Sequence, residues 1–422
     1  MTADQPETAD QERRKRIAWV LAPGLIAFSM GQTVLFALAG PVFRDIGMSE
    51  QQLGWIISAA AVMFVIASPI WGKISDRWGR KKSIVFGLIT YGIISLLFAG
   101  VMQLGLDGTM TAATVFVVLL VLRLLYASFG SGIQPSSVAL MADHSSEEQR
   151  SSAVAIVGAA FGLGMVLGPA AAPLLVSFGI LAPLYVIAVL GLITAGLAMW
   201  GLPKDAPAKT ESQSGSSKTS LKTLAPLLFG GFAIYTSMAT IQQTYAFNVQ
   251  DLLQVTSADT IRLTGYCFMV LAIATLLVQG GVIQVFKPRA QVLLYTGLPT
   301  ILAGLVVYLF ASQFWHLIIA SLVMGAGFGL TTPGFMSANS LMSSDDEQGR
   351  TAGWMQATMS AGFIVGPLAG TTVYGIAREL APVIAISATT LGLVTIGTWL
   401  FFQRATLANV TSTEARTNSE SS

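Results

Sequence analysis

The stretch Gly72 to Lys82, "GKISDRWGRKK", carries six charged residues in eleven positions. It ends an uncharged run that includes "AAAVMFVIASPIWG" (59–72). An apolar run of about 20 residues that ends in a basic cluster is typical of a membrane helix emerging into water. The stretch therefore predicts a membrane-spanning chain, and its aspartate, Asp76, needs a separate explanation because a basic anchor requires no carboxylate.

The composition also indicates a bilayer as the solvent. Hydrophobic residues make up 53% of the 422 residues and charged residues only 10%, whereas a soluble domain carries about 25% charged residues. One cysteine, Cys267, and two histidines, His144 and His316, are too few for a disulfide framework or a His–Cys metal centre. The net charge of +2 does not suggest nucleic acid. We expect no metal, no cofactor and no enzymatic site.

Uncharged runs long enough to cross a bilayer recur along the chain. We predict twelve spans, at 17–40, 53–75, 82–104, 112–141, 152–177, 182–202, 224–248, 262–285, 290–312, 314–341, 351–376 and 382–403. The polar segment "PKDAPAKTESQSGSSKTSLK" (203–222) is typical of a flexible linker. The predicted fold is an all-α membrane protein with an N-terminal tail (1–16), a six-helix bundle (17–202), a linker (203–223), a second six-helix bundle (224–404) and a disordered tail (405–422).

The placement of Lys and Arg predicts the orientation. Nineteen of the 23 basic residues fall in the tails, the linker and alternate loops, which lie on one side, and only Arg44, Arg262 and Arg378 fall on the other. Basic residues stay on the cytoplasmic side, so we expect both termini and the linker there. The first 16 residues end in "RRKR" without a following A-x-A-like cleavage site, so we interpret 17–40 as a retained helix.

The two halves contain an internal repeat. The segment "SSEEQRSSAVAIVGAAFGLGMVLGPAAAP" (145–173) aligns with "SSDDEQGRTAGWMQATMSAGFIVGPLAG" (343–370), and Gly164-x-x-x-Gly168-Pro169 maps onto Gly362-x-x-x-Gly366-Pro367 at an offset of 198 residues. Two related six-helix halves are typical of secondary transporters. A twelve-helix channel or membrane enzyme is the alternative.

These motifs resemble those of the major facilitator superfamily over about residues 17–404. Gly72, Asp76, Arg77, Gly79, Arg80 and Lys81 match its signature between helices 2 and 3. "GMVLGPAAAP" (164–173) resembles the helix-5 motif of its drug-efflux antiporters, with Ala172-Pro173 in place of the usual Gly-Gly. The helix-4 motif is looser, since the glycine expected near Arg123 is displaced to Gly130 and Gly132. The second copy of the signature has decayed to "GGVIQVFKPRAQ" (280–291).

The resemblance implies a gate at the basic loop. Gly72 and Gly79 should allow a tight turn and close helix approach. Asp76 should meet the positive N-terminal end of helix 11 when the cytoplasmic side is closed, while Arg80 pairs with Asp143. In helix 5, a stripe of small residues should allow close packing, with a kink at Pro169; the stripe consists of Gly158, Gly162, Gly164 and Gly168.

The resemblance also implies a central cavity lined by helices 1, 4, 7 and 10. Arg123 is the one basic residue inside a span, which marks it as a functional candidate, and Tyr126 shares its helical face. Helix 7 places four side chains on one face. With neighbours implied by the family, the predicted lining is Arg123, Tyr126, Gln32, Thr33, Tyr235, Met238, Gln242, Tyr245, Met336 and Asn339. Helix–helix packing or a structural arginine is the alternative for each.

No Asp or Glu lies in the middle of any predicted span, so the proton carrier of an antiporter is not evident. The nearest carboxylates lie at helix ends: Asp45, Asp143, Asp251, Asp259 and Glu379. We interpret the chain as a monomeric, proton-coupled exporter of a small organic molecule, a drug or a siderophore-like metabolite, in the bacterial inner membrane. A proton-coupled importer of an organic anion, with Arg123 holding a carboxylate, is the alternative.

Overall fold

The structure is a computed structural model that describes residues 5–145, 147–203, 221–341 and 348–420. Side chains are described within 12–145, 152–203, 224–338 and 353–400 and at Gln149 and Thr351. The described part of the chain is helical throughout, as the apolar runs predict, because a helix satisfies all of its backbone hydrogen bonds within one segment. The fold class is therefore confirmed.

The first half contains the six predicted spans as a chain of helices, one of which is broken. These are α1 (Gln5–Ile46), α2 (Glu50–Trp78), α3 (Arg80–Leu106), α4 (Ala112–Gly130) with α5 (Ile133–Asp143), α6 (Glu147–Leu175) with the short turn η1 (Val176–Phe178), and α7 (Ala182–Gly201). The break between α4 and α5 falls at Ser131 and Gly132.

The second half repeats this order. Its elements are α8 (Leu221–Leu253), α9 (Ser257–Leu277) continued through the π-turn η2 (Val278–Val282) into α10 (Ile283–Phe286), α11 (Ala290–Leu309), α12 (Phe314–Leu341), α13 (Gln348–Tyr374) and α14 (Leu380–Glu420). Eleven segments of the described chain are long and apolar enough to cross a membrane. The predicted span that is not among these eleven is the eleventh in the chain, helix α13; it has the length, but more of its positions hold small or polar residues.

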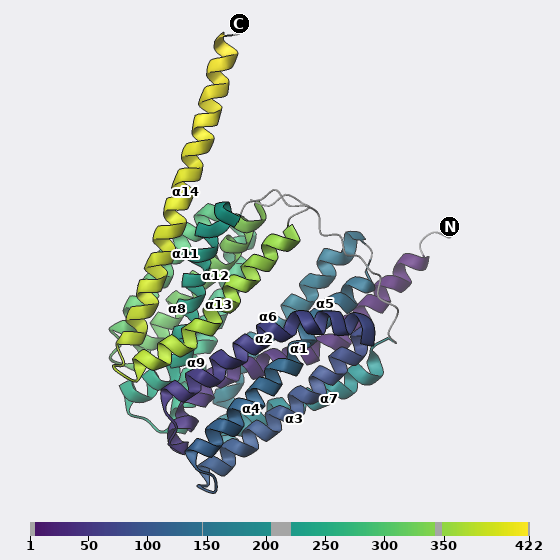
Figure 1. Cartoon of the computed structure of the whole chain (residues 1–422), viewed down its shortest axis with the longest axis vertical. Coiled ribbons are helices and arrows are strands. Elements are labelled where there is room, and N and C mark those ends of the chain that lie inside the picture. The colour runs from purple at the N-terminus through teal and green to yellow at the C-terminus, as the bar shows by residue number, and fades with distance from the viewer. Residues whose placement is uncertain (1–4, 146, 204–220, 342–347, 421–422) are drawn as a thin grey trace.

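Several helices extend beyond the predicted spans. Helix α1 begins at Gln5 and therefore includes the basic "RRKR" segment. Helix α14 continues to Glu420, where the sequence predicts a disordered tail, and it projects from the bundle in Figure 1. The difference has a local reason, because residues 401–420 contain no proline or glycine that would stop a helix. Polar residues mark where a helix leaves the apolar layer of the membrane, but they do not by themselves end the helix.

The charged stretch 72–82 forms a helix end and not an extended loop. Residues up to Trp78 belong to α2, and Gly79 alone separates it from α3. Gly79 has φ 115°, a conformation that favours glycine, which confirms the predicted turn. Gly72 is different: among the described residues, a Cβ at this position would meet nothing within 4 Å, so the structure shows no close helix approach there.

The internal repeat has the same packing role in both halves. Helix α6 lies against α1, where a side chain at Gly168 would lie 2.7 Å from the Met30 carbonyl oxygen. Helix α13 lies against α8, where a side chain at Gly366 would lie 2.7 Å from the Thr236 carbonyl oxygen. Gly164 is equally crowded, but Gly158 and Gly162 meet nothing within 4 Å. The predicted stripe of small residues therefore packs closely over half of its length.

The two halves meet at one end of the molecule. Gly54 of α2 lies against α13, and a side chain there would lie 3.1 Å from the Pro367 carbonyl oxygen. Gly265 of α9 lies against α6 in the same way, beside Pro169 and Pro173. In Figure 1 the ribbons of the halves converge at this end and diverge toward the end that holds the α2–α3 turn. We call these the closed end and the basic-loop end.

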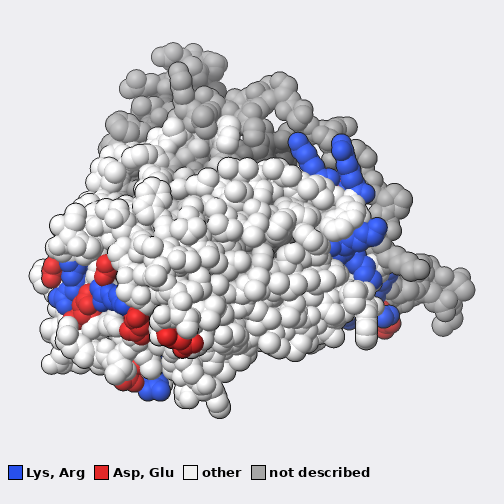
Figure 2. Space-filling model, turned by 60° about the horizontal axis from the view of Figure 1, so that its bottom comes forward, with Lys and Arg blue, Asp and Glu red and all other residues white. Residues whose placement is uncertain are grey.

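Charged side chains gather at the two ends of the molecule. The face shown in Figure 2 has acidic and basic side chains together at one end, mainly basic ones at the other, and an uncharged zone between them. An uncharged zone flanked by charged ends is the surface expected of a helix bundle in a bilayer. This pattern identifies a multi-pass membrane protein.

Candidate functional site

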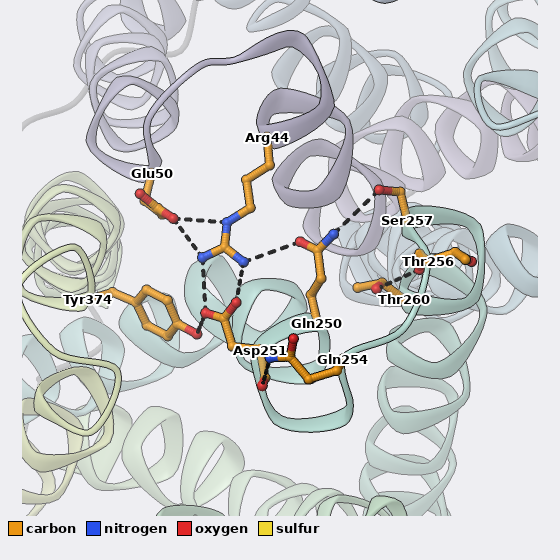
Figure 3. A network of polar contacts seen from close by, with 9 residues as sticks. All are labelled: Arg44, Glu50, Gln250, Asp251, Gln254, Thr256, Ser257, Thr260 and Tyr374. Atoms are coloured by element: carbon orange, nitrogen blue, oxygen red, sulfur yellow. Dashed lines mark hydrogen bonds and ion pairs between the residues drawn. The ribbon is translucent and has the colours of Figure 1, made fainter.

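A polar network joins the two halves at the closed end. The last turn of α1 supplies Arg44 and the first turn of α2 supplies Glu50, while α8 supplies Gln250 and Asp251 and the last residue of α13 is Tyr374. Figure 3 shows these five side chains converging. We call them the Arg44 network. Four helices from both halves contribute to it.

Arg44 binds Asp251 through a two-pronged contact. Its Nη1 lies 2.6 Å from Asp251 Oδ1, and its Nη2 lies 3.0 Å from Oδ2. The same guanidinium donates to Glu50 Oε1 at 2.6 and 2.9 Å and to Gln250 Oε1 at 3.2 Å. The planar guanidinium suits such paired contacts, which a lysine could not reproduce. One arginine therefore holds the start of α2 and the end of α8 together.

Asp251 is the most heavily bonded carboxylate of the network. The hydroxyl of Tyr374 donates to its Oδ2 at 2.7 Å, in addition to the two contacts from Arg44. The Arg44 guanidinium also lies 4.7 Å from the centre of the Phe247 ring. The side chains of Arg44 and Glu50 are 23% and 22% exposed, so their interaction is only partly screened by water. Two carboxylates share one guanidinium, which leaves the network one negative charge in excess.

At the basic-loop end the charged residues pair within one half. Arg80 forms an ion pair with Asp76 and lies 3.3 Å from Asp143, which confirms the predicted Arg80–Asp143 pair. Arg80 also donates to Ser75 Oγ at 2.7 Å, and Arg77 is exposed. The predicted contact of Asp76 with the start of the eleventh span, which is helix α13, involves residues outside the described side chains. That latch stays a prediction.

Arg123 lies inside the N-terminal bundle and not between the halves. It is 8% exposed, donates from Nη2 to Gln32 Oε1 at 3.2 Å, and its guanidinium lies 4.5 Å from the centre of the Tyr126 ring. Tyr126 is buried as well, against Phe28 and Tyr91. The sequence correctly pairs Arg123 with Tyr126 and places Gln32 near them, but their surroundings are helices of a single half.

The four side chains predicted to share one face of α8 separate into two environments. Tyr245 is fully buried within its own half, where its hydroxyl contacts Ser321 at 2.7 Å. Tyr235 is buried against Phe335 and Phe363. Met238 and Gln242 are half-buried, and Gln242 Oε1 has no hydrogen-bond partner. Gln242 and Met238 therefore remain as candidates for a lining, whereas Tyr245 packs inside the bundle.

The other predicted lining residues with described side chains, Thr33 and Met336, are not brought together. Thr33 is buried at the contact between α1 and α6, and its hydroxyl bonds to the Ser29 carbonyl of its own helix at 3.3 Å. Met336 is 55% exposed, and the side chain of Asn339 lies outside the described residues. Thr33 is therefore a packing residue, the alternative considered from the sequence.

Four members of the Arg44 network are missed by the sequence: Arg44, Glu50, Gln250 and Tyr374. One signal was available in the sequence. Arg44 is one of only three basic residues predicted to lie on the side opposite the cytoplasm, and the acidic residue Glu50 follows it by six positions. Its partner in the other half lies 207 positions away, however, and a contact of that separation has no signature in a single sequence.

Two helical half-bundles related by a repeat and joined at one end by an ionic network define the class of secondary transporters. Comparison with known proteins agrees. The model of the Major Facilitator Superfamily matches residues 21–256 and 224–420, so the chain belongs to this family.

Two named relatives and one solved structure show which members of the family the chain resembles. The chain is 24% identical over 375 residues to Multidrug resistance protein 2 of Bacillus subtilis, which covers 85% of this chain and 88% of that one. It is 22% identical over 364 residues to Quinolone resistance protein NorA of Staphylococcus aureus, covering 84% and 89%. A bacterial homolog of the lysosomal transporter Spinster, solved inward-facing and occupied, superposes with a TM-score of 0.70 at 16% identity, covering 93% and 97%.

Proposed function

We propose that the protein exports a small organic molecule, a drug or a metabolite, by alternating access and in exchange for protons. The observation that carries this proposal is the asymmetry of the contacts between the halves. The Arg44 network bridges them at the closed end, whereas among the described side chains the ion pairs at the basic-loop end lie within one half. A transporter that alternates needs an end that can be closed while the other is open.

We place the basic-loop end and both termini in the cytoplasm of a bacterial inner membrane. The support is the excess of Lys and Arg on that side and the bacterial origin of the relatives. In this orientation the conformation is inward-facing, as is that of the Spinster homolog. The printed names of the relatives, multidrug resistance and quinolone resistance, support efflux of amphipathic compounds.

For the proton, we propose the two carboxylates of the Arg44 network. Asp251 and Glu50 face one guanidinium, so a proton taken up by either would neutralise the excess charge. The same proton would weaken the link between the halves, since a neutral acid binds arginine less strongly than a carboxylate does. Proton binding and opening of the closed end are thereby coupled through one group of atoms.

Import of an organic anion held by Arg123 has weaker support. The guanidinium is buried inside one half, and the cavity beside it is only ≈ 20 Å³. An organic anion would not fit there in this conformation.

The test is transport in liposomes that contain the purified chain, with ethidium and a fluorescent quinolone as probes. Wild type should accumulate the probe in vesicles with an acidic interior. Asp251→Asn should lose this accumulation while still exchanging probe for probe when no gradient is imposed. The matched control is Asp259→Asn, which removes an exposed carboxylate paired with Arg262 within α9 and should behave as wild type. Accumulation driven by sodium with the proton gradient collapsed would refute proton coupling.

A further inference from the structure

A buried positive charge lies in the N-terminal bundle without a neutralising partner. Arg123 is 8% exposed; among the described residues it donates a hydrogen bond to the neutral side chain of Gln32 and lies over the ring of Tyr126, which is also neutral. Its Nε has no hydrogen-bond partner. Among the described side chains, no carboxylate lies within ion-pair distance of Arg123, since every ion pair with a described partner involves another arginine. A buried cation of this kind is costly unless it is paired.

The unpartnered groups line a small cavity. Arg123 and Tyr126 form its polar wall together with Ser95, and the remaining lining is apolar, from α1, α3 and α7. Tyr126 is 5% exposed, and its hydroxyl has no hydrogen-bond partner among the described residues. Two side chains that are more than nine-tenths buried, each with a polar atom that lacks a hydrogen-bond partner, therefore border the same space.

The cavity volume limits the occupant. It is ≈ 20 Å³, whereas pockets for organic ligands are roughly 300–1,000 Å³. One water-sized or slightly larger species fits, and an organic molecule does not. The occupant is therefore distinct from the transported substrate.

The chemistry of the lining favours an anion over water. The guanidinium can only donate hydrogen bonds, and the two hydroxyls can donate as well. Three donors facing one small space suit a species that accepts hydrogen bonds and carries negative charge. A water molecule would occupy the space but leave the charge of Arg123 uncompensated.

We propose that the N-terminal bundle holds one small inorganic anion of the halide type, chloride in the cell, bound by Arg123 and Tyr126. The anion takes the place of the missing carboxylate and stabilises the packing of α1, α3, α4 and α7 around it. The site lies within one half, and the proposal does not depend on the direction of transport or on proton coupling.

The experiment measures the melting temperature of the purified full-length chain in chloride and in gluconate at equal ionic strength. Gluconate is too large for the cavity. Wild type should melt higher in chloride, with saturation, and by roughly 2 °C once chloride is several times its half-saturating concentration. Arg123→Gln should lose the difference. The matched control is Arg262→Gln, which removes an exposed arginine in the other half and should keep it.

A second variant covers the case in which Arg123→Gln does not fold. Tyr126→Phe removes one donor at nearly constant volume and should raise the half-saturating chloride concentration about ten- to a hundredfold, as expected for one lost hydrogen bond to a charged group. Crystals grown in bromide should show an anomalous peak between Arg123 and Tyr126. Equal melting in chloride and gluconate for wild type would overturn the proposal. So would a chloride effect that survives both substitutions, or a cavity that holds only water in bromide.

Discussion

Both ends of the bundle contain an arginine that contacts two carboxylates. One of these arginines connects helices of a single half, and the other connects the two halves. Arg80 contacts Asp76 and Asp143, and all three belong to the first half. Arg44 contacts Glu50 of the first half and Asp251 of the second. An ion pair within one half moves with that half, whereas a pair between halves must break when they separate. The helix that carries the partner therefore decides whether a charge cluster can act as a gate.

The largest effect is expected from breaking the bridge between the halves. Arg44→Gln leaves Asp251 and Glu50 without their guanidinium in a partly buried position, which should disfavour the closed end by about 1–3 kcal/mol. Spin labels on the α1–α2 and α8–α9 turns should show longer distances, and gradient-driven transport should fall about tenfold or more. The control is Arg262→Gln at the same end, whose partner Asp259 lies on its own helix. If both variants give the wild-type distances, the network does not hold the halves together.

A comparable or smaller effect is expected from steric separation of the same end. Gly54→Ala places a Cβ against the Thr371 hydroxyl of α13 and 3.1 Å from the Pro367 carbonyl oxygen, and such overpacking costs about 1–3 kcal/mol. The melting temperature should fall, and the label distances at the closed end should lengthen as for Arg44→Gln. Gly100→Ala is the control, because a Cβ on that residue of α3 would meet nothing within 4 Å. A Gly54→Ala protein as stable as the Gly100→Ala protein would contradict the tight contact of α2 with α13.

The smallest effect is expected at the basic-loop end. The Asp76 side chain is half exposed and pairs with Arg80 of its own half, so Asp76→Asn should leave the melting temperature nearly unchanged. If the carboxylate meets the start of helix α13 when the basic-loop end is closed, its loss destabilises that closed state by roughly 0.3–2 kcal/mol. Labels across the basic-loop end should then report more of the open form, with reduced transport. An unchanged distance distribution would rule out the latch.

The fold was predictable because its signals are local. Uncharged runs set the helices, the linker divides them, and the repeat of Gly164 and Gly168 at Gly362 and Gly366 relates the two halves, which the structure packs in the same way at these glycines. Helix ends were less predictable: α14 continues past Arg404 because nothing in the following residues stops it.

The candidate site was predictable only in part, because burial and long-range pairing decide it. Arg123 stands out in the sequence as a cation within a span. Its sequence context does not tell whether the side chain faces the other half or the interior of its own bundle. Tyr245 has the spacing of a lining residue, and packing against α12 turns it inward. Asp251 was recognised as a carboxylate at a helix end, while its partner Arg44 belongs to another helix far away in the chain.

The excess negative charge of the Arg44 network has an electrical consequence. A charge that crosses the whole membrane gains or loses about 2.3 kcal/mol per 100 mV. A proton that reaches Asp251 from outside and leaves toward the basic-loop end crosses that field once per cycle. Under the proposed exchange of substrate for protons, the membrane voltage should drive export of a neutral substrate even when the pH is equal on both sides. Replacing the carboxylate at position 251 by an amide should abolish this voltage dependence.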